Sequence, residues 1–512
     1  MRLRFLVPLL LICSFSPAQQ RPPAPADAQP KLVLAIVVDQ FRYDYLTRFR
    51  EDFTGGLKRL LEQGAVFTNA YYEASPTVTA VGHSTFLTGA TPAKSGIVGN
   101  NWFDRDRGKA VSSVSDDQVK MLGGLGPGSS PSRLLVSTVG DELKMSGKGG
   151  KVIGISLKDR SAILPAGRKA DAAYWFDGAS GNIVSSTYYF PELPAWVREL
   201  NAGRPADRYA GQEWMGHKMP AAAGPQLYAG VDASPFGDEL LQALALRTLE
   251  AENLGTGPKI DLLAISYSSV DYVGHRDGPD SPEIHDMLKR VDRLMGALIA
   301  AAEARAGRGN VLVAFTADHG VTPVPEENQK RSLPGGRIVW NTYQAAVEQA
   351  LNQKFGAGQW ISFSADGVIY FRPDPIPGKK IDMAEVQKVA ADILRAEPHI
   401  ARVYTKTQLA AGVPGNDPVD MRVRNGFNPA RSGDIFTVTD PNYIFNATGT
   451  THGSPYEYDT HVPVIFLGSR RIRAASYANS IGVQDIAPTL AKLLGIRTPT
   501  GSMGRVLTEM LK

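Results

Sequence analysis

Long apolar segments recur along the chain and alternate with helical patterns. Five segments are apolar without polar alternation, which predicts strands that are buried on both faces. Between them, residues 238–253 and 281–305 carry apolar side chains three and four positions apart, which predicts helices. Strands that alternate with helices predict an α/β fold with a central, mostly parallel sheet flanked by helices. The five segments are KLVLAIVVD (31–39), KVIGISLKD (151–159), IDLLAISYSSVD (260–271), NVLVAFTADHG (310–320) and HVPVIFLG (461–468).

The pattern changes from about residue 321 to 446. Shorter strands are predicted at 360–371, 401–409 and 433–440, around one predicted helix near Met383 to Arg395. We interpret this region as an inserted α+β subdomain within a catalytic domain that spans residues 31–512. The amphipathic segment 483–496 predicts a final helix that closes the core.

The first eighteen residues, MRLRFLVPLLLICSFSPA, combine early arginines, a short apolar stretch and small residues near its end. This pattern predicts a signal peptide over residues 1–18, with a retained anchor as the alternative. Residues 19–30 are rich in Pro, Ala and Gln and predict a flexible leader. The only cysteine, Cys13, lies in the predicted signal, so we expect a mature chain without disulfide or thiol chemistry.

Composition narrows the classes of partner. The 512 residues are 43% hydrophobic and 21% charged, with a net charge of only +4. This balance gives no basic surface for nucleic acid as a specific partner and no polybasic membrane patch. We expect a periplasmic or secreted monomer that has no membrane attachment after signal cleavage.

Acidic residues lie where predicted strands end. Asp39, Asp271 and Asp318 each follow such a strand, and ligands of open parallel sheets bind beyond the carboxyl ends of the strands. Three carboxylates in one crevice repel one another unless cations neutralise them. An acid that follows a strand is, taken alone, more often a helix cap or turn former.

Histidines accompany two of these acids. His275 lies four positions after Asp271, a spacing that puts both side chains on one face of a helix. His319 follows Asp318 directly, and His452 comes late in the chain, in GTTHGSPY. Oxygen and nitrogen ligands without thiolates suit zinc, with manganese or iron as alternatives. The other histidines are interpreted as structural or solvated, with one of them, His461, close enough to His452 to support it. They are His83, His217, His285, His399 and His461.

Residues 71–105 are rich in hydroxyl groups and glycine and predict a loop that enters a helix near Thr79. A helix start offers free N–H groups to an anion, and a metal ion can activate a threonine hydroxyl as a nucleophile. A helix cap is the alternative for Thr79. Lys158 and Arg160, in SLKDR, are candidate phosphate-binding cations, with a solvated pair as the alternative.

The series of motifs resembles the alkaline phosphatase superfamily. The series contains an Asp after the first strand, a Thr before T-G-x-x-P-x-x-x-G-I, then D-x-x-x-H, D-H-G and a late H-G. It is most similar to the PafA-type phosphatases with a threonine nucleophile, near the nucleotide pyrophosphatase/phosphodiesterase branch. One departure is Lys94-Ser95, where many relatives have a histidine before the glycine, at a position that is not a metal ligand.

The resemblance implies metal-dependent hydrolysis of phosphate monoesters through a phosphothreonine intermediate. A phosphodiesterase or nucleotide pyrophosphatase is the main alternative, and a non-catalytic phosphate- or metal-binding protein is a further one. A sulfatase is disfavoured because the candidate site carries threonine rather than cysteine or serine. The implied cofactors are two Zn²⁺ ions, one held by Asp271, His275 and His452, the other by Asp39, Asp318, His319 and the oxygen of Thr79. The implied nucleophile is Thr79, and the implied phosphoryl-binding residues are Asn100, Lys158 and Arg160.

Overall fold

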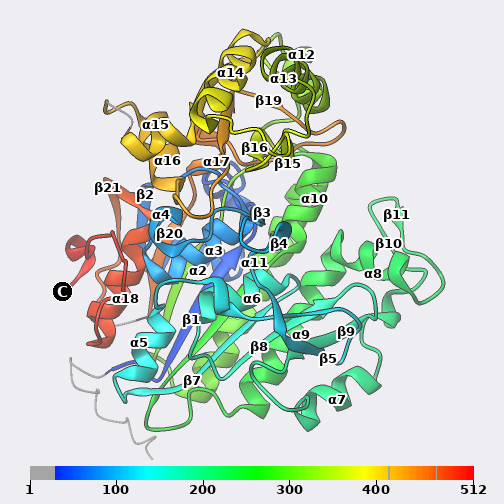
Figure 1. Ribbon diagram of the computed structural model, residues 1–512. Helices are drawn as coiled ribbons and strands as arrows, with labels where there is room; N and C mark the ends of the chain where they lie inside the picture. Colours follow the sequence, from blue (N-terminus) through cyan, green and yellow to red (C-terminus); the bar gives the residue numbers. More distant parts are fainter. Residues whose placement is uncertain (1–28, 413–414, 469) are drawn as a thin grey trace, which may run out of the picture.

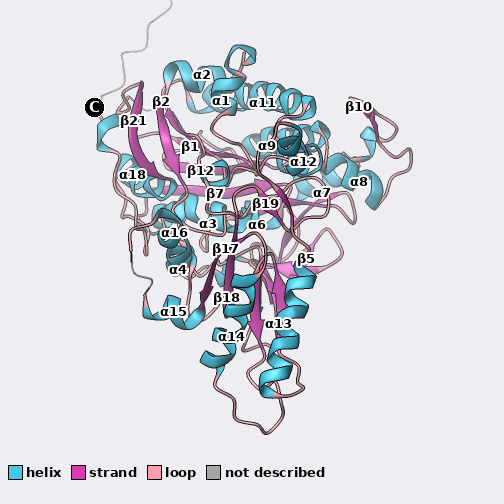
Figure 2. Cartoon of the chain, turned by 90° about the horizontal axis from the view of Figure 1, so that it is seen from above, coloured by secondary structure: helices cyan, strands magenta, loops and turns pink. Residues whose placement is uncertain are grey.

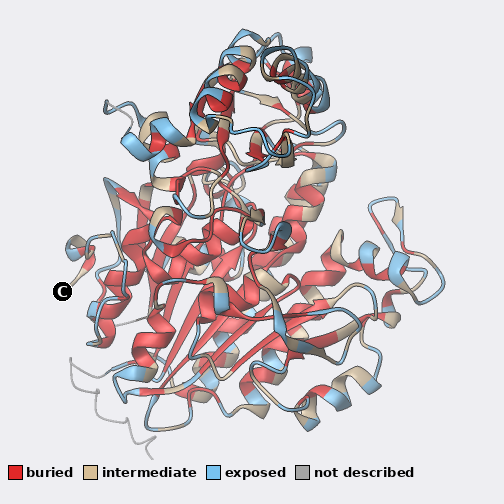
Figure 3. Ribbon diagram, in the orientation of Figure 1, coloured by how far each residue is buried: buried red, intermediate tan, exposed pale blue. Residues whose placement is uncertain are grey.

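A computed structural model describes residues 29–412, 415–468 and 470–512. The predicted signal (1–18) and most of the predicted leader lie outside these residues. An eleven-stranded sheet crosses the molecule and is buried along most of its length (Figures 1 and 3). Its strand order is β21-β2-β20-β13-β1-β12-β7-β8-β9-β5-β6.

The centre of the sheet is parallel, as the apolar segments predicted. β1 (Leu32–Val38) pairs in parallel with β12 (Ile260–Tyr267) on one side and with β13 (Val311–Thr316) on the other. β12 pairs with β7 (Gly149–Ser156), and β7 pairs with β8 (Ala172–Asp177). All residues of β1, β12 and β13 are buried, which explains why their sequences show no polar alternation.

The outer strands are mixed in direction. β20 (Val464–Leu467) runs antiparallel between β13 and β2 (Ala65–Tyr71), and β21 (Ala475–Gly482) pairs in parallel with β2. At the opposite edge, β9 (Asn182–Ser186) and β5 (Ser115–Leu122) are antiparallel to their neighbours. The edge strand β6 (Pro127–Ser129) is also antiparallel. An apolar run predicts burial of a strand but not its direction, so this arrangement could not be predicted from the pattern.

Helices cover both faces of the sheet (Figure 2). One layer contains α2 (Gly56–Gln63), α9 (Pro235–Ala251) and α11 (Pro282–Ala306). Ser281 caps α11, since its hydroxyl accepts the N–H of Ile284 at 3.2 Å. The other layer contains α3 (Thr79–Thr88), α5 (Val139–Met145), α6 (Asp159–Ala166) and α18 (Ile486–Leu494), the predicted final helix.

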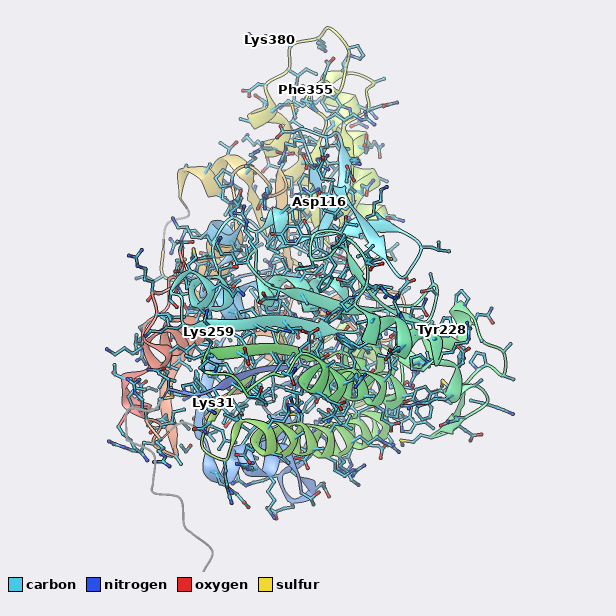
Figure 4. All side chains as sticks on the ribbon, turned by 90° about the horizontal axis from the view of Figure 1, so that it is seen from below. Lys31, Asp116, Tyr228, Lys259, Phe355 and Lys380 are labelled. Atoms are coloured by element: carbon cyan, nitrogen blue, oxygen red, sulfur yellow. The ribbon has the colours of Figure 1, made fainter. Side chains whose placement is uncertain are left out.

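The region predicted as an inserted subdomain contains a separate four-stranded sheet of order β15-β16-β18-β17. Its strands are β15 (Ile361–Ala365), β16 (Val368–Phe371), β17 (Ile400–Thr405) and β18 (Ile435–Thr439). It lies above the end of the large sheet where the parallel strands terminate (Figure 1). Figure 4 shows the molecule from below, turned by 90° from the view of Figure 1, with Phe355 and Lys380 at the far tip of this subdomain.

Three predictions within this region were wrong. The predicted strand at 360–371 is a hairpin of two strands, β15 and β16. The predicted helix is present as α14 (Met383–Ala396), but the subdomain also contains α13 (Trp340–Phe355), which was not predicted. This helix buries only Trp340, Val347 and Leu351, so its apolar pattern is weak. The predicted strand at 401–409 ends at Thr405. There a capping box between Thr405 and Gln408 begins α15 (Lys406–Ala411).

No helix among the described residues is long and apolar enough to cross a membrane.

Candidate active site

Four neighbouring strands bring the predicted site residues together. Because β13, β1, β12 and β7 are adjacent and parallel, their carboxyl ends meet at one edge of the sheet. Asp39 follows β1, Lys158 follows β7, and the pair Asp318 and His319 follows β13. After β12 comes α10 (Ser269–Asp277), which carries Asp271 and His275 one turn apart, as predicted.

Asp271, His275 and His452 form a first candidate metal group, with ligand atoms that lie within 4.8 Å of one another. Asp271 Oδ1 is 3.2 Å from His275 Nε2 and 3.6 Å from His452 Nε2. The Nδ1 atoms of the histidines lie 2.8 Å from the carbonyl oxygens of Thr450 and Thr77, respectively. An Nδ1–H that donates to a backbone carbonyl leaves Nε2 as the metal-binding nitrogen. Both rings therefore present Nε2 to the Asp271 carboxylate.

A second candidate group surrounds His319. Its Nε2 lies 3.4 Å from Asp39 Oδ1 and 3.3 Å from Asp318 Oδ2, while its Nδ1 is 2.9 Å from the Gly320 carbonyl oxygen. Both of those carboxylate oxygens are buried and have no hydrogen-bond partner among the described residues. Buried oxygens are rarely left without a partner. A cation between these atoms would satisfy them, so the donor set fits a metal ion.

The electrostatics of both groups also favour cations. Burial, together with the Asp39 carboxylate, raises the pKa of Asp318 well above its usual value. Burial lowers the pKa of His319 to about 3 and that of His452 well below its usual value, so both imidazoles are neutral, the form that binds metals. Burial would also lower the pKa of His275, but Asp271 outweighs it and raises that pKa to about 9. The Asp271 carboxylate thus favours a positive charge at His275 Nε2.

Lys158 lies between the two groups. Its Nζ donates to Asp39 Oδ2 and to Asp271 Oδ2, both at 2.6 Å. Burial would lower the pKa of the ammonium, but these two carboxylates hold it above its usual range. The contact between Lys158 and a phosphoryl group, which the resemblance implies, stays a prediction.

Thr79 is the first residue of α3 and is only 1% exposed. Its Oγ1 lies 3.5 Å from His319 Nε2, so the hydroxyl faces the second group. The helix can approach this closely because Gly82 packs on the backbone of Asp318, where a Cβ atom would lie 2.1 Å from the carbonyl oxygen. Thr79 therefore combines a helix start with a neighbouring candidate metal site.

Two predicted phosphate-binding residues lie on or against helices α3 and α6, which pack together. The Ala80 N–H donates to Asn100 Oδ1 at 2.8 Å, which leaves the amide NH₂ group of Asn100 as a donor for a ligand. Arg160 lies in the first turn of α6, and its buried Nε–H has no hydrogen-bond partner among the described residues. Both side chains thus retain donors that an anion could use.

Comparison with known proteins agrees with this geometry. Residues 33–462 match the family model of type I phosphodiesterase / nucleotide pyrophosphatase. The chain belongs to this family. Alkaline phosphatase PhoV of Synechococcus elongatus is 36% identical over 95% of this chain and 94% of its own length. Alkaline phosphatase PafA of Elizabethkingia meningoseptica is 33% identical over 99% of both chains.

Solved structures of the family support the same assignment. The crystal structure of wild-type alkaline phosphatase PafA superimposes with a TM-score of 0.88 at 32% identity, over 95% of this chain and 99% of that one. Murine ectonucleotide pyrophosphatase / phosphodiesterase 5 superimposes with a TM-score of 0.58 at 17% identity, which shows the shared fold alone. Within the family, the chain is therefore of the PafA type that the sequence motifs indicated.

Gln40 is a site residue that the sequence analysis missed. Its backbone N–H donates to Asp318 Oδ1 at 3.1 Å, and its side-chain Nε2 donates to Asp271 Oδ1 at 2.6 Å. The residue has a φ of 62° and packs so tightly that a Cβ atom on Gly274 would lie 1.8 Å from its Oε1. Gln40 thus orients one carboxylate of each candidate group. Its position next to Asp39 was the only signal in the sequence.

His83 was interpreted as structural or solvated, but it lies against the second group. Its Nδ1 is 2.9 Å from the Thr79 carbonyl oxygen and 3.3 Å from Asp318 Oδ2, and its side chain is fully buried. Burial lowers the pKa of His83 to about 4. The signal available in the sequence was its position one helical turn after Thr79.

The remaining histidines lie elsewhere. His461 stacks between Tyr43 and Tyr71 and contacts the Thr68 carbonyl oxygen at 2.8 Å through Nε2, so the structure gives it a different role from the expected support of His452. The other three pair with carboxylates nearer the surface. The pairs are His217 with Glu283, His285 with Asp52 and His399 with Asp440.

Asp459 holds the loop that carries His452. Its buried Oδ2 accepts the N–H groups of Gly453 at 3.0 Å and of Ser454 at 2.8 Å. We expect Asp459→Ala to lower the free energy of unfolding by about 1–3 kcal/mol, because two partly buried N–H groups lose their acceptor. Zinc affinity, measured by competition with a chelator, should fall as well.

Asp440→Ala is the control for this prediction, because Asp440 pairs with His399 at the surface. It should change neither the stability nor the zinc affinity appreciably. Equal zinc affinity in Asp459→Ala and the wild type would show that the loop does not depend on Asp459.

Proposed function

We propose that this protein is an alkaline phosphatase that hydrolyses phosphate monoesters through a phosphothreonine formed on Thr79, with two Zn²⁺ ions as cofactors. The observation that carries the proposal is the position of Thr79 Oγ1, at the start of α3 and 3.5 Å from the Nε2 atom of His319. The names of the full-length relatives PhoV and PafA support the same activity.

The two Asp/His groups would hold the ions: Asp271, His275 and His452 the first, and Asp39, Asp318 and His319 the second. Two divalent cations there supply positive charge, which lowers the pKa of a nearby hydroxyl and stabilises a departing alkoxide.

The protein's own groups orient the reacting atoms. The start of α3 places the Thr79 hydroxyl toward the phosphorus atom, and the Asn100 amide and the Arg160 guanidinium donate to the phosphoryl oxygens. The Lys158 ammonium adds positive charge between the two groups. Because negative charge builds up on the phosphoryl group and the leaving oxygen, fixed donors at these positions stabilise the transition state.

A phosphodiesterase is the second candidate, because the matching family model is that of type I phosphodiesterase / nucleotide pyrophosphatase. Lys158 and Arg160 favour the monoester, which carries more negative charge than a diester. Localisation in the periplasm or outside the cell belongs to the proposal on the basis of the predicted signal peptide. A monomeric state belongs to it as an expectation from the sequence.

The experiment that tests this function compares a matched aryl phosphate monoester with a methyl aryl diester. The wild type should have the higher kcat/KM for the monoester. Lys158→Ala/Arg160→Ala should lose monoester activity far more than diester activity. Each charge-assisted hydrogen bond is worth about ten- to a hundredfold in rate.

Zinc content must be measured in parallel, because Lys158 also contacts the candidate ligands Asp39 and Asp271. Arg168→Ala serves as the control, since this arginine lies after α6 and is exposed. A wild type that prefers the diester, or a double variant that loses both activities equally at unchanged zinc content, would contradict the monoesterase assignment. A zinc-loaded wild type without turnover of either ester would indicate a non-catalytic binding protein.

A further inference from the structure

A cavity of about 270 Å³ lies between the inserted subdomain and the catalytic centre. On the catalytic side it is lined by Val78, Asn100 and His452. Val78 immediately precedes the proposed nucleophile, and His452 belongs to the first candidate metal group. The cavity therefore adjoins both the proposed nucleophile and the first candidate metal group.

The opposite wall of the cavity comes from the subdomain and is largely apolar and aromatic. It includes Phe363, Val368 and Tyr370 from β15 and β16, together with Phe436 and Phe445. A buried cavity of about 150 Å³ can hold a benzene molecule. A space of about 270 Å³ therefore has room for an aromatic ring and its linker.

Several hydroxyl groups on this wall already donate hydrogen bonds to backbone carbonyl oxygens. Thr437 Oγ1 donates to the Gly367 carbonyl at 2.8 Å, and Thr439 Oγ1 donates to the Tyr443 carbonyl at 2.8 Å. Tyr370 donates its phenolic proton to the Arg431 carbonyl at 3.0 Å. A polyhydroxylated leaving group would lose hydrogen bonds to water here without gaining these donors in exchange.

The charges of the residues that line the cavity bear on which leaving groups it can bind. Among the described residues that line the cavity there is no lysine or arginine, and the one carboxylate is that of Asp366. A leaving group with its own phosphate or carboxylate would be desolvated here without a cationic partner. The lining therefore disfavours anionic leaving groups.

The wall is fixed relative to the nucleophile. α16 (Pro418–Gly426) is hydrogen-bonded to the loop before Thr79, through Arg422 to the Tyr72 carbonyl at 3.2 Å and through Asn425 to the Glu73 carbonyl at 2.7 Å. Gly426 packs so closely on Ser75 that a Cβ atom would lie 1.6 Å from its carbonyl oxygen. The cavity is thus built into the fold.

We propose that this cavity binds the leaving group of the substrate, and that the preferred substrates are phosphate monoesters of uncharged aryl or arylalkyl alcohols. The inference rests on the proposed phosphatase function and deepens it. Transfer of a phenyl-sized group from water into such a site favours the transition state by about ten- to a hundredfold.

The test compares 2-phenylethyl phosphate with ethyl phosphate, because both release a primary alcohol of similar basicity. The wild type should show a kcat/KM about ten- to a hundredfold higher for the phenylethyl ester. Ala365→Trp places an indole in the cavity and should abolish this preference while ethyl phosphate hydrolysis stays within about threefold. Ala357→Trp, at an exposed position of the same subdomain near Phe355 (Figure 4), should keep the preference.

Competitive inhibition of the wild type gives a measurement that does not depend on the folding of a variant. 2-Phenylethylphosphonate should inhibit about tenfold or more tightly than ethylphosphonate. Equal inhibition, equal kcat/KM for the two esters in the wild type, or a parallel loss of both activities in Ala365→Trp would each overturn the inference while leaving the phosphatase function intact. Absence of hydrolysis of both esters in the zinc-loaded wild type would overturn the proposed function, and the inference with it.

Discussion

Thr79→Ala should lose turnover by at least about a thousandfold, because it removes the oxygen that attacks phosphorus. Thr79→Ser should remain within about tenfold of the wild type, since the hydroxyl is kept at the start of α3. The measurement is kcat/KM for an aryl phosphate in zinc-loaded protein. The two variants differ in the presence of the hydroxyl, so the comparison isolates the nucleophile from the packing of the helix.

Thr85→Ala is the control for this experiment. Thr85 lies in the same helix, and its hydroxyl donates to the Ala90 carbonyl at 3.1 Å, away from the candidate metal groups. Its removal should lower stability without lowering kcat/KM more than about threefold. Undiminished turnover in Thr79→Ala would remove Thr79 from the mechanism.

Asp271→Ala should produce the second large loss of catalytic activity. Asp271 belongs to the first candidate group, and its ligand atoms also lie close to Asp39 and His319 of the second group. Its loss also leaves the Lys158 ammonium with one carboxylate instead of two. We expect at least a thousandfold drop in kcat/KM and a lower number of bound zinc ions per chain.

Asp277→Ala is the matched control, because Asp277 lies in the same helix, α10, and belongs to a third cluster with His217 and Glu283. The Arg276 guanidinium lies 3.4 Å from His217 Nε2 and pairs with Asp277, so this cluster already has a cation. Zinc content should be unchanged in this variant. Full zinc occupancy and activity in Asp271→Ala would contradict the proposed ligand set.

Much of the site could be predicted because its geometry follows from the order of strands. An acid directly after a buried parallel strand must lie at the carboxyl edge of the sheet, and β13, β1 and β12 are neighbours there. The spacing of Asp271 and His275 fixed both on one helical face before the helix was known. The place of each acid at a strand end and the helical spacing depend on local sequence, whereas the division of the residues into two metal groups was implied by the family resemblance.

Contacts between distant segments could not be predicted in the same way. The bond between Gln40 and Asp271 and the contact between His83 and Asp318 join residues more than two hundred positions apart. The direction of β20 depends on how the chain returns from the subdomain, which an apolar run does not reveal. α13 escaped prediction because it packs through few residues, and most of its surface is polar.

The central claim, hydrolysis through a phosphorylated Thr79, is tested most directly by mass spectrometry of acid-quenched enzyme. Zinc-loaded wild type is mixed with a phosphate monoester, quenched in acid during turnover, digested and analysed by fragmentation. The account predicts one added phosphoryl group on the peptide that contains Thr79, located on that residue and absent from Thr79→Ala treated in the same way. A phosphoryl group on a different residue, or none on any peptide of an enzyme that is turning over and is trapped at several quench times, would contradict it.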